Sequence, residues 1–338
     1  MKVLFCIRSD YYRNFSEDSI QMLKMLEYLK SKGAQVDIND GNIYDYSSYD
    51  IVHLFNLSKI GETYKYYKLA KKYKKKIVLS PLYWDYSKYY KYIDDEEDLK
   101  LWKKCNLYRL EVLRGSSIIY VNSKCEGELI KNNFEKNIEY KVIYTGVDLE
   151  NEGLPLYSFK ERHNLNNFIL SIGRISRSNN QLMLAKVCND LDYNLLLIGN
   201  VYDTEYYNKC MKYYNVLRLK DVDNYDIYNA YKFAKVYVQP SFLQTSYISC
   251  MQAALHGCNI ITSNSGVSKE YFKDMATYFD PYNYESMYKA ISSAYKKRKN
   301  DNLRNHVLKN YKWETSLEKL YKSYIEILDK KCKKNIIY

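Results

Sequence analysis

The second half of the chain contains a run of residues whose types suit the binding of a diphosphate. In residues 171–180 an apolar stretch ends at Gly173-Arg174, and a helix is expected a few residues later. Glycine lets a phosphate approach the backbone, and an arginine at a strand tip can clamp a diphosphate with two hydrogen bonds. A plain turn with a surface arginine would give the same pattern, so this run alone leaves both interpretations open.

Two further stretches carry the same kind of chemistry. Residues 240–257 predict a strand end, a polar loop and a helix, with Thr245 and Ser246 at the amino end of that helix. Free backbone N–H groups at such an end attract an anion. Gln252 follows about two turns later. Gly199-Asn200 provides another strand tip with a glycine.

Strands and helices must bring these tips together. Near-continuous apolar runs separated by amphipathic segments indicate parallel strands with helices on both faces of the sheet. In the first half, strands are expected at 3–7, 35–38, 51–55, 77–80, 117–121 and 141–144. In the second half, they are expected at 168–172, 194–198, 216–219, 236–239, 259–262 and 277–279, and the closing segment 315–328 is helical in pattern.

The first helix is expected to follow the first strand. It should start near Ser16, with Glu17 and Asp18 in its first turn, where carboxylates suit the helix dipole. Gly33 can end it. Its inner stripe is expected to consist of four apolar residues at helical spacing, Ile20, Leu23, Leu26 and Leu29.

The repeated pattern predicts an α/β protein with two doubly wound, Rossmann-like domains facing a central cleft. The expected boundaries are 1–150 for the first domain, 151–167 for a linker, 168–314 for the second domain, and 315–338 for a closing helix and basic tail. Ligands of such sheets bind at the carboxyl ends of the strands. We therefore expect the Gly173, Gly199 and Ser246 regions to face the cleft.

Length and composition favour a globular protein over a disordered, fibrous or membrane-spanning one. A length of 338 residues, 46% apolar and 27% charged, fits a globular chain of two domains. No apolar run approaches the ~18 residues of a membrane span, and the first run, about five residues, is too short for a signal peptide, so a cytoplasmic protein is expected. The eight scattered cysteines predict reduced side chains and no metal site.

The net charge of +12 indicates an anionic partner. Lysines gather at 71–76 and in the tail, and such runs are usually solvated helix faces. They also favour anionic lipid, nucleic acid or phosphorylated substrates. Arginine is scarce and no basic recognition helix is present, so nucleic acid is not expected as a partner.

The order of several short motifs resembles that of the retaining glycosyltransferases of family four, which have the GT-B fold. The resemblance covers most of the chain. Besides Gly173-Arg174 and the 240–257 loop, it rests on five motifs: Asp50-Ile51-Val52-His53, Asn122-Ser123, Thr145-Gly146-Val147-Asp148, Asp280-Pro281 and Tyr311-Lys312-Trp313. Of the four histidines, His53 on a strand and His256 at a helix end are expected to be structural.

The resemblance implies roles around a nucleotide-sugar donor, such as a UDP- or GDP-sugar, with no metal or other cofactor. Arg174 would be the catalytic residue, stabilising the departing diphosphate together with N–H groups near Thr245 and Ser246. Gln252 would hold the ribose and Gln244 the donor sugar. The other donor-binding positions are Gly173, Asn179, Gly199, Asn200 and Tyr247.

Several of these positions depart from the family pattern. Asn179 stands where the family has a lysine, and Gln244 and Gln252 stand where it has two glutamates. Thr245 and Tyr247 stand where glycines are usual, and Glu17 and Asp18 replace a glycine pair near the first helix. Amides still donate and accept hydrogen bonds, and Arg177 could compensate for the lysine. The alternative is a catalytically silent GT-B subunit that binds glycan or supports an active partner.

An aromatic cluster at 82–92 follows a strand tip that the resemblance places on the acceptor side. Tyr83, Trp84 and Asp85 open it, and lysines are interleaved with its tyrosines. Such rings suit stacking on a glycan or glycolipid acceptor, or a peripheral position on an anionic membrane at its inner face. The chain contains 41 tyrosines, however, and a solvated tyrosine-rich loop would look the same.

Overall fold

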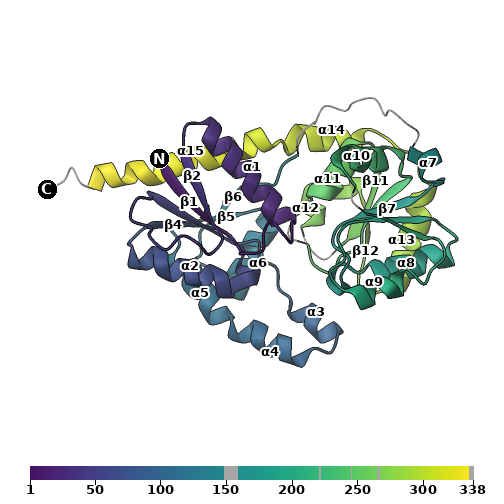
Figure 1. Ribbon diagram of the computed structural model, residues 1–338, viewed down its shortest axis with the longest axis horizontal. Coiled ribbons are helices and arrows are strands. Elements are labelled where there is room, and N and C mark those ends of the chain that lie inside the picture. Colours follow the sequence, from purple (N-terminus) through teal and green to yellow (C-terminus); the bar gives the residue numbers. More distant parts are fainter. Residues whose placement is uncertain (148–158, 221, 245, 265–266, 335–338) are drawn as a thin grey trace. The chain divides into compact units, whose positions relative to one another are not determined.

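The computed structural model describes residues 1–147, 159–220, 222–244, 246–264 and 267–334. It divides into two compact units, Met1–Gly146 with Tyr311–Tyr338 as unit 1 and Val147–Asn310 as unit 2 (Figure 1). Each unit holds one six-stranded sheet, and every strand pair in both is parallel. The expected α/β class is confirmed. Of the linker expected at 151–167, residues 151–158 lie outside the described residues, and Phe159–Arg162 form a short helix, α7.

The sheet of unit 1 has the strand order β2-β1-β3-β4-β5-β6. Its strands are β1 (Lys2–Cys6), β2 (Gln35–Asn39), β3 (Ile51–Phe55), β4 (Lys76–Ser80), β5 (Ile118–Val121) and β6 (Lys141–Val142). All six lie within the expected segments or within one residue of them at each end, because long apolar runs between polar residues mark buried parallel strands.

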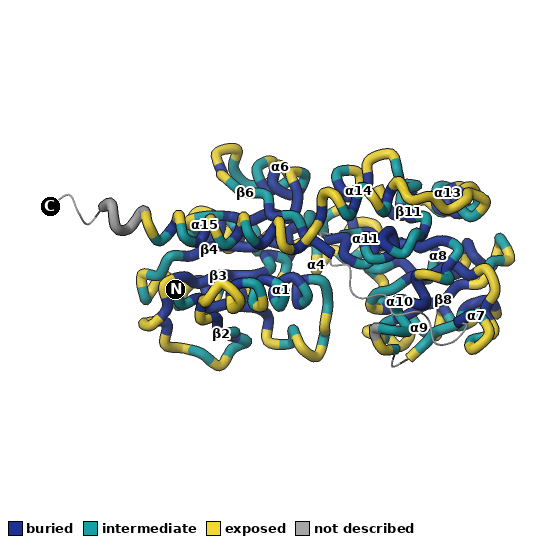
Figure 2. The backbone as a smooth tube through the Cα atoms, turned by 90° about the horizontal axis from the view of Figure 1, so that it is seen from above, coloured by how far each residue is buried: buried dark blue, intermediate teal, exposed yellow. Residues whose placement is uncertain are grey.

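Helices cover both faces of this sheet. On one face the core joins strand residues such as Leu4, Val52 and Leu79 to helices α2 and α5; the other face is covered by α1 and α15, which contact each other. The described helices of unit 1 are α1 (Glu17–Ser31), η1 (Leu57–Lys59), α2 (Ile60–Lys72), α3 (Ser87–Tyr92), α4 (Glu96–Lys104), α5 (Asn106–Gly115), α6 (Lys124–Asn133) and α15 (Trp313–Lys334). Figure 2 shows the resulting contrast between buried strands and exposed loops.

Helix α1 starts where expected, but its buried stripe is not the expected one. Of the four apolar residues predicted to face inward, only Leu29 is fully buried. The buried face instead consists of Asp18, Ser19, Gln21, Met22, Met25 and Leu29. The physical reason is a polar anchor: Arg8, buried at the end of β1, pairs with Asp18 and turns that side of the helix inward. Gly33 ends the helix as predicted, at a φ of 80°.

The sheet of unit 2 has the order β12-β11-β10-β7-β8-β9. Its strands are β7 (Ile169–Ile172), β8 (Leu195–Ile198), β9 (Val216–Leu219), β10 (Val236–Gln239), β11 (Asn259–Ser263) and β12 (Thr277–Phe279). Counted within the unit, this order is 3-2-1-4-5-6 from β9 to β12, the arrangement of the doubly wound dinucleotide-binding fold. The chain therefore reverses direction across the sheet between β7 and β10.

Two layers of helices cover the sheet of unit 2. Helices α8, α9 and α13 share one core with residues such as Ile169, Leu197 and Val238, while α11 contacts β10, β11, α10 and α14. The described helices of this unit are α7 (Phe159–Arg162), η2 (Arg177–Asn179), α8 (Gln181–Asp190), α9 (Thr204–Cys210), α10 (Asn224–Phe233), α11 (Ile248–Leu255), α12 (Ser268–Phe272), η3 (Lys273–Met275), α13 (Tyr284–Lys296) and α14 (Asn302–Asn310).

Helix α15 follows unit 2 in the sequence but packs on unit 1. Its buried residues Leu317, Leu320, Tyr324 and Ile327 recur at helical spacing. Burying each such side chain contributes roughly 1.5–3 kcal/mol. Although α15 has 22 residues, neither it nor another described helix is apolar enough along its length to cross a membrane.

The contact between α15 and the sheet centres on His53, in the middle of β3. His53 is fully buried; its Nε2 lies 2.9 Å from Ser80 Oγ and its Nδ1 bonds to the hydroxyl of Tyr324. The ring stacks on Phe55 at 4.2 Å between centroids. These contacts confirm the structural role expected for His53. Burial lowers the pKa of His53 to about 3 because a charged imidazole would lose its hydration.

This burial makes the stability of unit 1 depend on pH. The imidazole stays neutral in the folded chain but takes up a proton in the unfolded chain below its ordinary pKa of about 6.5. Stability is therefore complete above pH 6.5 and falls as the pH drops from there toward 3. Between pH 7 and pH 5 the loss from His53 should be about 2 kcal/mol. Urea unfolding of the wild type and of His53→Gln at both pH values measures it, and equal losses in the two proteins would contradict it.

Candidate functional site

The candidate site begins at the two strand tips where the chain of unit 2 reverses. Ligands of doubly wound sheets bind outside the carboxyl ends of the strands at this point. Here β7 leads into Gly173 and Arg174, and β10 leads into Pro240 and Ser241. The structure thus places two of the sequence-predicted stretches on neighbouring strands, which pair through Val236 and Ile169.

Glycines let the tips of β7 and β8 lie against each other. Gly173 and Gly199 have φ values of 152° and 146°, which disfavour other residues. A Cβ added at Gly199 would lie 2.1 Å from the carbonyl oxygen of Gly173, closer than atoms can approach. The N–H of Gly173 donates to the carbonyl of Ile198 at 2.9 Å. Bare backbone at this edge is therefore a requirement of the packing, and it also leaves room for a phosphate.

Asn179 joins the two tips by hydrogen bonds. Its Nδ2 donates to the carbonyl of Arg174 at 2.6 Å, and its Oδ1 accepts from Ser241 Oγ at 3.2 Å. Ser241 in turn accepts from Gln239 Nε2 at 2.8 Å, and Gln181 makes a second bond to the Arg174 carbonyl at 2.7 Å. The residue at the position of the family's lysine thus acts as a tie between loops.

Arg174 is exposed beyond this tie. Its guanidinium lies over the ring of Tyr202, 5.8 Å from the ring centroid. Among the described residues it makes no ion pair and no side-chain hydrogen bond, so its five donors face outward for a ligand. Such a side chain at a doubly wound switch point suits a phosphate or diphosphate.

Arg177, expected to compensate for the missing lysine, is engaged elsewhere. Its Nε lies 2.9 Å from Asp203 Oδ2 and its Nη2 lies 3.6 Å from Glu205 Oε2. The positive charge added by this arginine is thus balanced by two carboxylates at the start of α9. Within the part of the chain that the structure describes, Arg174 is the guanidinium of the β7 loop that has no carboxylate partner.

The loop before α11 supplies the other side of the site. Ser246 is fully buried, and its Oγ has no hydrogen-bond partner among the described residues. The side chain of Gln244 donates to the carbonyl of Ser246, which fixes the entry to the helix. Tyr247 is also fully buried, with its ring against Tyr271 and Phe272, so it packs the core. Thr245 lies outside the described residues.

Gln252 and His256 lie further along α11. Gln252 is half-buried in the second turn of α11. Its backbone carbonyl lies 2.8 Å from Nδ1 of His256, a hydrogen bond in which the ring nitrogen donates. The imidazole stacks on the rings of Tyr228 and Tyr231 at the end of the helix. This confirms the structural role expected for His256.

Arg218 is a residue that the sequence analysis missed. Arg218 lies on β9 and donates from Nε and Nη2 to the carbonyl of Gly199 at 3.1 and 3.0 Å. The carbonyl of the following residue, Asn200, accepts from the N–H of Ile175 at 2.9 Å. Arg218 therefore holds the β8 tip from the neighbouring strand. The available signal was a charged residue inside an apolar strand, at a position that pairs with Leu197, two residues before Gly199.

Two of the three residues predicted for the acceptor side make internal contacts. Tyr83 is buried and stacked on Trp102, and its hydroxyl accepts from Asn133 at 3.1 Å. Burial raises the pKa of Tyr83 to about 12. Asp85 accepts from Trp102 Nε1 at 3.2 Å and from the N–H of Ser87 at 2.9 Å. Trp84 is half-exposed, and among the described residues it makes no side-chain hydrogen bond or ring contact of this kind.

Comparison with known proteins identifies the second half of the chain. Residues 157–312 match the family model described as glycosyl transferases group 1. This confirms the resemblance drawn from the motifs. No curated protein matches the chain by sequence.

Solved structures confirm the GT-B fold over nearly the whole chain. Sucrose-phosphate synthase from Thermosynechococcus elongatus superposes with a TM-score of 0.81 at 15% identity, covering 97% of this chain and 99% of that one. Anabaena HepE, in complex with UDP and glucose, gives 0.75 at 12%, covering 96% and 100%. WaaG, a glycosyltransferase involved in lipopolysaccharide biosynthesis, gives 0.65 at 11%, covering 93% and 94%.

In unit 1 the loop after β1 carries a charged cluster at the position where the family of the resemblance has a glycine pair. Arg8 Nε lies 2.8 Å from Asp18 Oδ2, and its Nη1 lies 2.6 Å from Asp10 Oδ1. Burial alone would raise the pKa of Asp18, but its hydrogen bond and charge pairing with Arg8 outweigh burial and lower the pKa to about 2. A carboxylate held this way is a poor proton acceptor, so Asp18 positions the loop.

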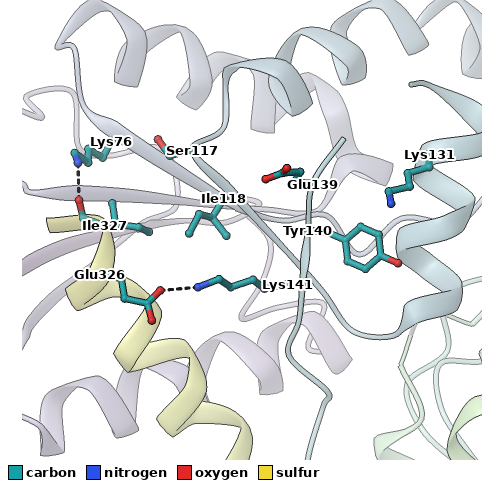
Figure 3. Close-up of a pocket in the computed structure, with 9 residues that line it drawn as sticks. All are labelled: Lys76, Ser117, Ile118, Lys131, Glu139, Tyr140, Lys141, Glu326 and Ile327. Carbon is teal, nitrogen blue, oxygen red and sulfur yellow. Dashed lines mark hydrogen bonds and ion pairs between the residues drawn. The ribbon is translucent and has the colours of Figure 1, made fainter. Parts of the chain in front are cut away.

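A cavity of about 530 Å³ lies at the opposite edge of the unit 1 sheet, where β4, β5 and β6 begin (Figure 3). Its lysines contact neighbouring groups: Lys141 pairs with Glu326 at 2.7 Å, and Lys76 donates to the carbonyl of Ile327 at 2.5 Å. These bonds hold α15, so we interpret the cavity as part of that packing. Across the described residues, no group of three His, Cys, Asp or Glu side chains could hold a metal ion.

Proposed function

We propose that this chain transfers a sugar, with retention of configuration, from a nucleotide-sugar donor to a glycan or glycolipid acceptor in surface polysaccharide or glycoconjugate synthesis. The observation that carries the proposal is the unpaired Arg174 guanidinium at the switch point of a glycosyl transferases group 1 domain. The buried, unpartnered Ser246 Oγ beside α11 adds a polar contact to the same side of the sheet. Both groups suit the diphosphate of a donor.

In the proposed reaction the acceptor hydroxyl oxygen bonds to the anomeric carbon of the donor sugar. The bond from that carbon to the diphosphate oxygen breaks, and the acceptor proton passes to the departing diphosphate. Arg174 would stabilise the negative charge that develops on the leaving group. Gln252 would bind the ribose and Gln244 the sugar, each as an amide that donates and accepts. The proposed reaction needs no metal or added cofactor.

The proposed donors are UDP- and GDP-sugars. HepE, similar in fold, is in complex with UDP and glucose, and WaaG is involved in lipopolysaccharide biosynthesis. These similarities support a nucleotide donor and a surface-glycan product for this chain. The chemistry of Arg174 and Ser246 addresses the diphosphate, which all such donors share.

A second function, a catalytically silent subunit, is favoured by one observation. Asn179 does not stand in for the family's lysine as a charge; it is tied to Arg174 and Ser241. With both glutamates replaced by glutamines, the site holds fewer charged groups than the family pattern. Each such exchange costs on the order of 1 kcal/mol of hydrogen-bond energy, which weakens binding about fivefold and leaves catalysis feasible. We therefore keep the transferase as the main proposal.

We also propose a cytoplasmic location, with unit 1 meeting the inner face of an anionic membrane. The tyrosines expected to make this contact are partly internal, since Tyr83 and Tyr89 are buried. The exposed apolar side chains lie later, in α3–α5 and their connections: Tyr92, Ile93, Leu101, Leu107 and Tyr108. Lys100, Lys103 and Lys104 are exposed among them, a mixture of apolar and basic groups that suits an anionic lipid surface.

Arg174→Ala should weaken binding of the nucleoside diphosphate by about 2 kcal/mol, or about thirtyfold, because a charged contact is lost. Titration calorimetry with UDP and GDP measures this. Arg177→Ala is the matched control: that guanidinium is already paired with Asp203 and Glu205, so its loss should leave affinity unchanged. Equal affinities for wild type and Arg174→Ala would place the donor elsewhere.

Restoring the family's charges separates the transferase from the silent subunit. If the site works with amides, Gln252→Glu and Gln244→Glu should each lower donor turnover, because they bring negative charge toward a diphosphate. Donor hydrolysis and glycan transfer are measured for the wild type, the singles, and the triple variant Asn179→Lys, Gln244→Glu, Gln252→Glu. An inactive wild type with an active triple variant would establish decay of the site and refute the transferase.

The membrane proposal is tested by co-sedimentation with vesicles. Binding to vesicles containing phosphatidylglycerol should exceed binding to pure phosphatidylcholine and should decline with salt, since screening weakens the lysine contribution. Leu107, 74% exposed, should lower binding when changed to Ser, whereas Tyr214→Ser on unit 2, equally exposed at 79%, should not. Equal binding to both lipids, or to neither, would exclude the contact.

A further inference from the structure

Unit 1 contains a second cavity, of about 400 Å³, between the amino end of α2 and the helices α3, α4 and α5. This cavity and Arg174 belong to different units. The cavity of Figure 3 is lined by other residues, where β4, β5 and β6 begin. The volume of the second cavity falls in the lower part of the ~300–1,000 Å³ range of small-molecule sites. The residues that line it include apolar, aromatic and charged side chains.

The unusual member of this lining is Arg109, on α5. Only 1% of its surface is exposed, yet each of its hydrogen bonds goes to a neutral oxygen. Its Nε donates to the carbonyl of Leu57 at 3.0 Å, and its Nη1 donates at 2.7 Å to both the carbonyl of Trp102 and Oδ1 of Asn106. Among the described residues no carboxylate lies within ion-pair distance of Arg109, although the charge of Asp85 acts on it from further away, and its Nη2 makes none of these bonds.

A buried positive charge without a counter-charge is costly, and proteins pair such groups as a rule. A guanidinium cannot avoid that cost by losing its proton. Stacking supplies part of the compensation, since the guanidinium carbon of Arg109 lies 3.6 Å from the ring centroid of Trp102. Arg109 lines the cavity, and its remaining donor, Nη2, is suited to an oxyanion of a ligand.

The other charged groups of the lining are compatible with one oxyanion. Lys59 and the first turn of α2, at Ile60 and Gly61, add positive potential to the same wall. Of the two acids, Glu62 is turned toward the β1 loop, because both of its carboxylate oxygens accept bonds from Ser9 at 2.9 Å. Asp98 is exposed and can accept hydrogen bonds from hydroxyl groups.

The apolar part of the lining suits a sugar ring. Tyr90 and Trp102 contribute aromatic surface and Leu101, which is exposed, contributes an aliphatic edge. Sugars present C–H groups to aromatic rings and hydroxyls to carboxylates, and this cavity offers both beside the guanidinium. A neutral sugar would bring no negative charge to the guanidinium of Arg109.

We propose that the cavity beside Arg109 binds a sugar ring that carries one carboxylate or phosphate and, resting on the proposed transferase function, that this ring belongs to the acceptor. Nη2 of Arg109 donates to the oxyanion, Asp98 accepts from ring hydroxyls, and Trp102 and Leu101 pack against the ring. The inference thus gives the acceptor a charge and a location in unit 1.

The binding experiment uses the full chain and four probes: D-glucuronate, D-glucose 6-phosphate, neutral D-glucose and inorganic phosphate. Calorimetry or ligand-observed NMR should show that the two acidic sugars bind at least tenfold more tightly than glucose. Arg109→Gln should reduce that affinity at least tenfold. Arg114→Gln is the matched control on the same helix, because Arg114 is exposed and paired with Glu135.

A second variant keeps the test valid if Arg109→Gln fails to fold. Gly61 lines the cavity, and a Cβ added there meets no atom within 4 Å. Gly61→Leu should fill the space, abolish binding of the acidic sugars and leave the helix intact, since leucine favours a helix over glycine. Lys65→Leu, one turn later and exposed, is its control and should leave binding unchanged.

The results separate this inference from the proposed transferase. Acidic sugars that bind no better than glucose, or whose binding persists in Gly61→Leu, would overturn the cavity site even if nucleotides bind. Inorganic phosphate that binds as tightly as glucose 6-phosphate would overturn the sugar part. Binding of acidic sugars without any nucleotide binding would refute the transferase and keep the cavity site. Transfer to neutral acceptors alone, unaffected by Gly61→Leu, would overturn the acceptor role.

Discussion

Parallel strand pairing is the constraint on which both units depend. A parallel strand returns only through a crossover on the face of the sheet, so every strand of a unit runs the same way and every strand end meets one edge. The loops that follow β7, β8 and β10 therefore gather without any direct attraction between them. Close contact at that edge then demands residues without side chains, and Gly173 and Gly199 meet the demand at φ values near 150°. The parallel pairing that forms the sheet therefore also places the loops of the candidate site.

The few arginines show how the chain divides charge between structure and binding. Arg8, Arg177 and Arg218 are each occupied, by Asp18, by Asp203 and by the carbonyl of Gly199. Arg174 and Arg109 have no such carboxylate partner among the described residues. A rigid fork of five donors is of most use where its partner is planar and anionic. The surface charge, by contrast, is carried mainly by lysine, which remains hydrated.

The sequence predicted the twelve strands because each is a short apolar run between polar residues, a pattern set by local burial. It misplaced the inner face of α1, since Arg8 at the end of β1 draws Asp18 inward, and a stripe of leucines cannot reveal that pairing. The Gly-Arg tip was visible as a motif. The bonds of Asn179 to Ser241 and of Arg218 to Gly199 were not, because their partners lie 62 and 19 residues away. Tyr83 was read as a surface ring, but Trp102 covers it.

The position of α15 has a consequence for how the chain is made. Unit 1 consists of two separate stretches, with all of unit 2 between them. On the ribosome, the sheet of unit 1 emerges first, but the helix that covers His53 and Tyr120 is translated only after unit 2 is complete. Unit 2 is one continuous stretch of the chain, so all of its strands are translated before α15 and it can fold without that helix. Helix α1 is made early and covers part of this face, but the part under α15 stays uncovered for about 160 codons. Exposed apolar surface of this kind makes a nascent chain prone to aggregation in that interval.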